Sequence, residues 1–356
     1  MGGAAIVVLL GCAGLSRRPI LSEPPSEASR QEAAPWQAAE ELPDLDCETH
    51  GSSFAWLALE GSPPVVAQAL DGLARCPDAP DREAIAIYLM GHPEPAVAGA
   101  ALRLAKALLA EREHSPRDPL LEEVVRATTH EDMAVRFEAV EVLDTVPWTS
   151  EPALEAAMLQ AAADPSPPVV AEVLGRAYQR AAGLQEVDAW SMIARYALLA
   201  HLDPGIRGRG ALLLARLRPE QRSTRLLLRA ALDDDHPHVR AIAARALAEA
   251  GDRAAVHLFV ERLRDDEATQ VPATWAMLPW EGTDGREREL VFEGAYFERV
   301  DDAMLRAAAK LTEGMDQPFV LRDINLRYLD LDLVAGVRDL MGWYELHHDE
   351  LPPLDE

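Results

Sequence analysis

Lysine, cysteine and aromatic residues are scarce in this sequence. Of 34 basic residues only two, Lys106 and Lys310, are lysines, and each follows an alanine. A Gly-Lys phosphate-binding loop is therefore absent. The three cysteines include no Cys-x-x-Cys pair, which excludes zinc sites and dithiol redox catalysis built on that motif. We expect no metal and no cofactor.

Acidic charge dominates the composition. The 60 acidic residues outnumber the 34 basic ones, and the formal net charge is −26. Such a chain repels nucleic-acid phosphate, so no nucleic-acid partner is expected. Aromatic residues make up only 5% of the chain, and alanine and leucine dominate its hydrophobic share of 49%. This mixture favours helices over sheets and predicts an all-α fold.

The first apolar run, Ala4–Leu10, is shorter than the roughly 20 residues that span a bilayer. It ends in Leu9-Leu10-Gly11-Cys12, which resembles the lipobox of bacterial lipoproteins. The resemblance implies that residues 1–12 are a signal segment and that Cys12 is acylated. The protein would then be lipid-anchored in the bacterial cell envelope and face the periplasm. Signal peptides begin with a positively charged region, but no basic residue precedes this run. The alternative is a cytoplasmic protein with an incidental cysteine.

Residues 13–45 are rich in proline, glutamate, serine and alanine and have no periodic apolar face. Such a segment buries too little apolar surface to offset the conformational entropy lost on folding. We expect a disordered tether between the anchor and the folded part.

Internal repeats fill residues 46–280. The hexapeptide Ser62–Ala67 recurs unchanged as Ser166–Ala171, and each copy is a proline-bearing turn whose next aliphatic residue opens a helix. The same pattern recurs at intervals of 32, 38, 34, 37 and 33 residues, with the anchors Val65, Val97, Val135, Val169, Ile206 and Val239. This period predicts a solenoid of helix–turn–helix units. We expect a degenerate seventh unit at Val271.

The clearest unit, Asp235-His236-Pro237-His238-Val239-Arg240-Ala241-Ile242-Ala243-Ala244, resembles the HEAT repeat family. It is closest to the short bacterial HEAT-like repeats of the bilin-lyase type, and Arg136 and Arg207 occupy the place of Arg240 in their own units. The resemblance implies an α-solenoid of about six to seven HEAT-like helix pairs, with the second helices lining a concave surface. It also implies a protein-interaction function.

Residues 281–356 lose the repeat period. Within them, residues 302–311 and 331–343 have the pattern of amphipathic helices. We expect a divergent cap over the open apolar end of the solenoid, followed by a polar, frayed tail from Glu345.

Two cysteines flank the first helix pair, Cys47 before it and Cys76 after it. In an oxidising periplasm we expect a disulfide between them, closing a loop of about 30 residues and stapling the terminal repeat. Two buried free thiols are the alternative.

No catalytic motif is found in the sequence. Histidines stand beside carboxylates in residues 130–132, 233–238 and 347–350, but the first two groups lie in expected turns, where these residue types cap helices. Iron-dependent hydroxylases built on HEAT-like repeats carry His-Glu pairs after the Val-Arg position, where this chain has Phe137-Glu138, Gly208-Arg209 and Ala241-Ile242. We expect no enzyme. The alternative is a soluble HEAT-like enzyme of the cofactor-lyase or metal-hydroxylase type.

Arginines gather in residues 201–264, which contain twelve of them and eight acidic residues. On the expected second helices, the early units direct acidic side chains outward and the later units direct arginines outward, namely Arg207, Arg209, Arg240 and Arg245. We expect a groove with an acidic and a basic end, in which these four arginines bind an unidentified protein. In the alternative, they pair with aspartates in the turns of adjacent repeats. The sequence thus predicts a non-enzymatic, envelope-anchored interaction scaffold that meets the membrane only through its lipid.

Overall fold

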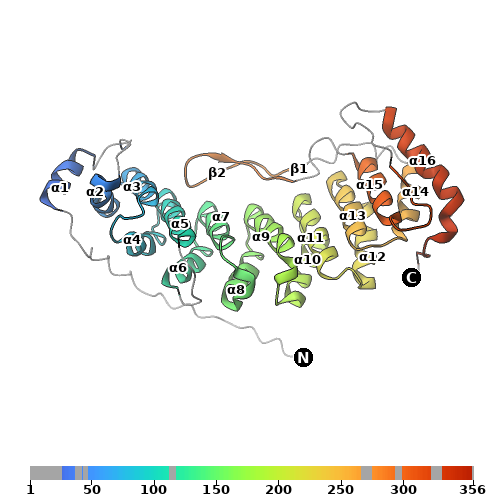
Figure 1. The fold of residues 1–356 in the computed structure, drawn as a ribbon, viewed down its shortest axis with the longest axis horizontal. Helices are drawn as coiled ribbons and strands as arrows, with labels where there is room; N and C mark the ends of the chain where they lie inside the picture. The colour runs from blue at the N-terminus through green and yellow to red at the C-terminus, as the bar shows by residue number, and fades with distance from the viewer. Residues whose placement is uncertain are drawn as a thin grey trace. The chain divides into compact units, whose positions relative to one another are not determined.

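The computed structural model describes residues 26–36, 42, 47–111, 118–265, 275–292, 299–321 and 331–354. The chain forms two compact units, Met1–Ala127 and Thr128–Glu356. Both consist of helices packed in pairs (Figure 1), and the expected all-α solenoid is confirmed. None of the helices in the described part of the chain is both long and apolar enough to cross a bilayer.

The described part of the first unit contains one short helix, two helix pairs and a further helix, α6. Its helices are α1 (Glu27–Ala33), α2 (Cys47–Glu60), α3 (Pro63–Arg75), α4 (Arg82–Leu89), α5 (Pro95–Ala110) and α6 (Pro119–Ala127), with a 3-10 turn, η1 (Ala34–Trp36), after α1. Helix α2 packs on α3 and α4 on α5, while contacts between α3 and α5 join the two pairs.

The short helix α1 lies inside the segment that we expected to be a disordered tether. It packs on α2, and Ala33 is fully buried. Glu32 Oε1 lies 2.8 Å from His50 Nε2, and the Trp36 ring meets the His50 ring edge-on at 6.2 Å. Residues 26–36 therefore belong to the folded part. Their order depends on packing against α2, which cannot be predicted from their own sequence.

The second unit continues the helix pairs and adds a hairpin. Its helices are α7 (Met133–Leu143), α8 (Pro152–Ala161), α9 (Pro167–Gln179), α10 (Val187–Ala200), α11 (Pro204–Leu217), α12 (Arg222–Ala230), α13 (Pro237–Glu249), α14 (Ala255–Asp265), α15 (Val300–Thr312) and α16 (Leu331–His347). Short 3-10 turns lie between them: η2 (Trp148–Ser150), η3 (Ala181–Gly183), η4 (Ala231–Asp233) and η6 (His348–Glu350). The strands are β1 (Trp275–Ala276), β2 (Trp280–Glu281), β3 (Glu287–Arg288) and β4 (Val291–Phe292).

Proline starts most of the second helices because its fixed φ suits the first helical turn and its missing N–H has no acceptor there. Where an aspartate precedes the helix, it caps the free N–H groups. Asp132 Oδ1 accepts from Ala134 N at 2.8 Å, and Asp203 Oδ1 accepts from Gly205 N at 2.8 Å. The anchor residue that follows faces the core, and all six anchors are fully buried.

The seventh helix pair differs from the expected one. Helices α14 and α15 pack together, and α15 packs on α13, so α15 extends the row α7, α9, α11, α13. The hairpin of residues 275–292 is inserted between the two helices of this pair. Val271 lies outside the described residues, and Trp275 belongs to a strand rather than to a helix.

The C-terminal tail is also more ordered than expected. Helix α16 packs on α14 and α15, and Leu351 behind it is buried. His257 of α14 lies 2.7 Å from Tyr344 Oη through Nδ1 and 3.1 Å from Pro352 O through Nε2. Arg229 of α12 donates to Leu354 O. The residues after Glu345 thus hold the last helices together rather than fray.

Candidate interaction surface

The hairpin of residues 275–292 is an antiparallel ribbon with two short paired segments. Trp275 pairs with Phe292 and Trp280 with Arg288, and the segments are joined by a hydrogen bond from Met277 N to Leu290 O of 2.9 Å. The turn closes with Gly282 N donating to Arg286 O at 2.8 Å, and Gly285 has a φ of 71°, which glycine adopts without strain.

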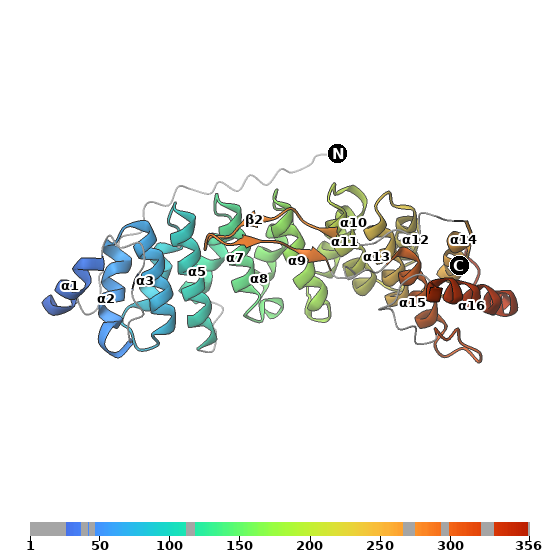
Figure 2. The ribbon, with the colours of Figure 1, turned by 90° about the horizontal axis from the view of Figure 1, so that it is seen from above.

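The hairpin lies along the row of second helices in its own unit. In Figure 1 and Figure 2 it runs past α11 and α9 to α7, with its turn near α7. Contacts at both ends agree, because the hairpin meets Glu138 on α7 and His236 beside α13. We call the side of α7, α9, α11 and α13 that faces the hairpin the groove face.

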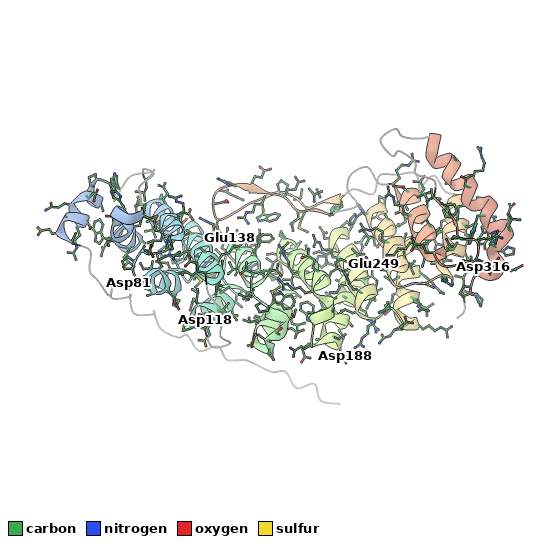
Figure 3. All side chains as sticks on the ribbon, viewed as in Figure 1. Asp81, Asp118, Glu138, Asp188, Glu249 and Asp316 are labelled. Carbon is green, nitrogen blue, oxygen red and sulfur yellow. A yellow bond between two sulfur atoms is a disulfide. The ribbon has the colours of Figure 1, made fainter. Side chains whose placement is uncertain are left out.

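The acidic end of the groove face is at α7. Glu138 is only 4% exposed, and its Oε1 accepts hydrogen bonds from Thr283 Oγ1 at 2.6 Å and from Arg288 Nη2 at 3.0 Å. Arg288 Nη1 also donates to Glu141 Oε2 at 3.2 Å. Figure 3 labels Glu138 on the side of α7 below the hairpin turn. One arginine of the hairpin thus meets two carboxylates on one helix.

Aromatic contacts accompany this ion pair. The rings of Phe137 and Trp280 meet edge-on with centroids 5.2 Å apart, and the Arg288 guanidinium lies 5.9 Å from the Phe137 ring centroid. At the other end of the hairpin, the Trp275 ring meets the His236 ring edge-on at 4.7 Å. The hairpin is therefore seated by aromatic residues at both ends.

A cavity of about 270 Å³ lies further along the groove face, between α9, α11, α13 and strand β4. It is lined by Gly175, Tyr178, Gln179, Gly208, Arg209, Leu212, His238, Ile242, Arg245 and Val291. Two of the four predicted arginines, Arg209 and Arg245, thus come together there. Gly175 makes room for one of them, since a Cβ at this position would lie 1.8 Å from Arg209 Nη1.

Tyr178 in the cavity wall is tied to the C-terminal end of α13. Its Oη donates to Glu249 Oε1 at 2.5 Å, and Figure 3 labels this glutamate. Burial, followed by the hydrogen bond to Glu249, raises the pKa of Tyr178 to about 12. The phenol therefore stays protonated at neutral pH and acts as a hydrogen-bond donor.

The other two predicted arginines lie near the starts of α11 and α13, and their side chains bond to groups in the turns. Arg207 donates to both carboxylate oxygens of Asp234 at 2.7 and 2.9 Å, and to His201 O at 3.1 Å. Its side chain is 13% exposed. Arg240 donates to the carbonyls of Asp234 at 2.9 Å and of Asp235 at 3.2 Å. For Arg207 the geometry is that of the alternative, pairing with a turn aspartate of the next repeat.

Arg136 of α7 has the same arrangement two repeats earlier. It donates to Asp164 Oδ2 at 2.7 Å and Oδ1 at 3.0 Å, and to His130 O at 2.8 Å. We call Arg136 and Arg207, with their aspartates, the turn ladder. These ion pairs connect neighbouring repeats, whereas Arg209 and Arg245 line the cavity.

The turn histidines act as local caps. His130 Nδ1 and His201 Nδ1 each accept a backbone N–H two residues later at 3.0 Å, and His236 Nδ1 does so at 3.2 Å. In the tail, His347 Nδ1 lies 2.9 Å from Glu350 Oε1. Among the residues that the structure describes, no cluster of three or more histidines, cysteines and carboxylates is placed to hold a metal ion.

Two of the three cysteines lie among the residues that the structure describes. Cys47 at the start of α2 and Cys76 after α3 are joined by a disulfide. Cys12 lies outside the described residues.

The sequence analysis did not predict the hairpin. Two signals for it are present, namely the Asp284-Gly285 dipeptide typical of a tight turn and the two tryptophans that precede it, Trp275 and Trp280. The strands have only two paired residues each, so the alternation of polar and apolar residues is too short to be recognised.

Comparison with known protein families shows a similarity to HEAT repeats. The sequence profile of HEAT repeats matches residues 194–277, which include α11 to α14 and strand β1. A search of curated proteins found no match. The matched part contains six of the ten residues that line the cavity, Arg209 and Arg245 among them. Its similarity to HEAT repeats points, at a coarse level, to a protein-interaction scaffold.

Proposed function

We propose that this protein is a non-enzymatic scaffold that docks another protein on its groove face. The observation that carries the proposal is the hairpin itself: 18 residues of polypeptide lie across several helices and are held by an ion pair, hydrogen bonds and aromatic contacts. A surface that holds polypeptide in this way has the chemistry of a protein-binding site. The match to HEAT repeats supports the same role.

The basic end of the groove face supplies the test. Arg209 and Arg245 line the cavity, so the double substitution Arg209→Glu/Arg245→Glu should weaken capture of the partner and reduce its salt dependence. We expect the melting temperature to stay within a few degrees of wild type. Capture is measured by crosslinking in membranes followed by mass spectrometry.

Arg207→Ala is the contrasting variant. It removes a turn-ladder ion pair and leaves the Asp234 carboxylate short of a donor, so it should lower the free energy of unfolding by about 1–3 kcal/mol. Partner capture by the folded fraction should be unchanged. If Arg209→Glu/Arg245→Glu binds the partner as well as wild type, or melts much earlier, the proposed role of the two arginines is wrong.

We also propose that the scaffold is lipid-anchored through Cys12 in the bacterial envelope and faces the periplasm. The Cys47–Cys76 disulfide supports this address, because disulfides persist in oxidising compartments. Lipoprotein maturation attaches several acyl chains, which together hold a protein firmly on a membrane.

The anchor rests on a single sulfur atom. Cys12→Ala, expressed in the natural host, should therefore move the protein to the soluble fraction or leave it as unprocessed precursor. Ser16→Ala, outside the lipobox-like residues, is the matched control and should remain in the membrane. Membrane-bound, correctly processed Cys12→Ala protein would contradict the anchor.

A further inference from the structure

We infer that the acidic end of the groove face recognises an extended basic segment of another protein that presents an arginine beside an aromatic ring, and that residues 275–292 occupy this place as a competitor within the same chain. The inference rests on the proposed scaffold function and specifies the chemistry of its partner.

Glu138 identifies the charge that the site accepts. A carboxylate that is 4% exposed needs hydrogen-bond donors, because burial without them carries a large desolvation cost. Two of its donors, the Thr283 hydroxyl and the Arg288 guanidinium, come from the hairpin rather than from the helices. A segment that takes the place of the hairpin and buries Glu138 again must supply a cation and a second donor in their place.

The contacts of Arg288 show which kind of cation fits the acidic end of the groove face. Its two terminal nitrogens donate to different carboxylates, those of Glu138 and Glu141, while its guanidinium lies near the Phe137 ring. Lysine, a point charge, would not span both carboxylates in this planar fashion. Trp280 is the cross-strand partner of Arg288 and packs edge-on against the same ring, so guanidinium and indole are presented side by side.

The charge of the chain favours the same partner. With a net charge of −26, the protein attracts basic segments and accelerates their encounter with it. Glu138 and Glu141 then give such a segment a defined place to pair.

The hairpin is suited to be displaced. Isolated two-stranded ribbons are marginally stable in water, and this one has only two-residue strands, so its shape depends on the contacts with the groove face. Part of the hairpin is uncovered, with Leu278 86% exposed. Since α15 packs directly on α13 and α14, the helix row is continuous without the hairpin.

The test uses a fluorescently labelled synthetic peptide of residues 275–292 and the full-length protein. In the wild-type chain the tethered hairpin has a high effective concentration and should keep the peptide out. The double variant Trp280→Ala/Arg288→Ala weakens the tethered hairpin and should bind the peptide at least about tenfold more tightly. Circular dichroism should show unchanged helix content.

Two further variants locate the binding site. Adding Glu138→Gln to the double variant should reduce peptide affinity about tenfold or more, because a charge-assisted hydrogen bond is lost. Arg288→Ala alone is the milder opening variant and should give a smaller gain. Arg286→Ala is the matched control: its side chain is 85% exposed, its nearest carboxylate is Asp284 of the same turn at 3.9 Å, and it should leave the wild-type affinity unchanged.

The inference is overturned if neither opening variant gains affinity, if Glu138→Gln has no effect, or if a peptide carrying Arg288→Glu binds as tightly as the unaltered one. Should the peptide fail while Arg209→Glu/Arg245→Glu still weakens partner capture, the scaffold function stands and only this partner chemistry is wrong. Loss of both results would overturn the scaffold function as well.

Discussion

Single side chains in the turns decide how each second helix begins. Histidine and aspartate occupy equivalent places there: His201 accepts from Asp203 N, and Asp164 accepts from Ser166 N at 2.7 Å. Such acceptors satisfy N–H groups that the helix leaves unpaired. The imidazole ring does so only while its Nδ1 is unprotonated, so His201 and His236 make stability sensitive to pH.

Acidification should therefore destabilise the second unit between about pH 7 and about pH 5. Burial, with the nearby Arg207 charge, lowers the pKa of both His201 and His236 below the ordinary 6.5. A group whose pKa is lower in the folded state contributes stability above its unfolded pKa and loses it as pH falls through the folded value. The double variant His201→Asn/His236→Asn keeps an acceptor that does not titrate and should lose less stability than wild type over this range.

Urea unfolding at several pH values measures this difference. His348→Asn is the control, because that side chain is 47% exposed and lies in the tail. Equal pH slopes for wild type and the double variant would contradict the proposed contribution of His201 and His236.

Pairs of helices approach each other most closely where the repeat places a small residue. At the α10–α11 contact this residue is Gly210, and a Cβ there would lie 2.7 Å from Ala194 O and 2.8 Å from Leu198 N. Both are backbone atoms of α10, which cannot turn away as a side chain could. The equivalent positions Ala69, Ala101 and Ala139 already carry a Cβ, so α11 is the closer fit.

Gly210→Ala should accordingly destabilise the protein by about 1–3 kcal/mol, because α10 and α11 must move apart. Gly342→Ala is the matched control, since Gly342 lies in α16 with nothing within 4 Å of its added Cβ. Alanine there should stabilise the helix by up to about 1 kcal/mol. Both changes are measured by urea denaturation, and a neutral Gly210→Ala would mean that α10 and α11 can separate without cost.

Across the whole molecule, two features stabilise the terminal repeats of the solenoid. The disulfide joins the ends of the first complete helix pair in the first unit, and α16 with the C-terminal tail covers α14 and α15 in the second. Terminal repeats have a neighbour on one side only and need such caps.

Loss of the disulfide should weaken the first unit. Cys47 and Cys76 are 29 residues apart, and closing a loop of this size contributes about 3–4 kcal/mol by restricting the unfolded chain. Cys47→Ser/Cys76→Ser should lower the free energy of unfolding by about this amount, as measured by urea denaturation followed by circular dichroism. Wild-type protein under reducing conditions should match the variant. If reduction leaves the wild-type transition unchanged, the bridge does not stabilise the unit.

The helical repeat can be predicted from local sequence signals. Each unit combines a proline turn with an aliphatic anchor, and these signals act within a few residues, so the buried position of all six anchors follows from the sequence. The sequence also pointed to Arg209 and Arg245 as members of a groove, although not to the cavity that brings them together.

The segment that lies in the groove and the arginines that face it depend on contacts between residues far apart in the chain. Arg288 meets Glu138 across 150 residues of chain, and no local pattern encodes that contact. Arg207 and Arg209 are two residues apart on one helix and so point about 200° away from each other. One reaches the aspartate of the next turn and the other the cavity, because only the packing of the neighbouring repeat places Asp234 on one side of α11 and Gly175 on the other.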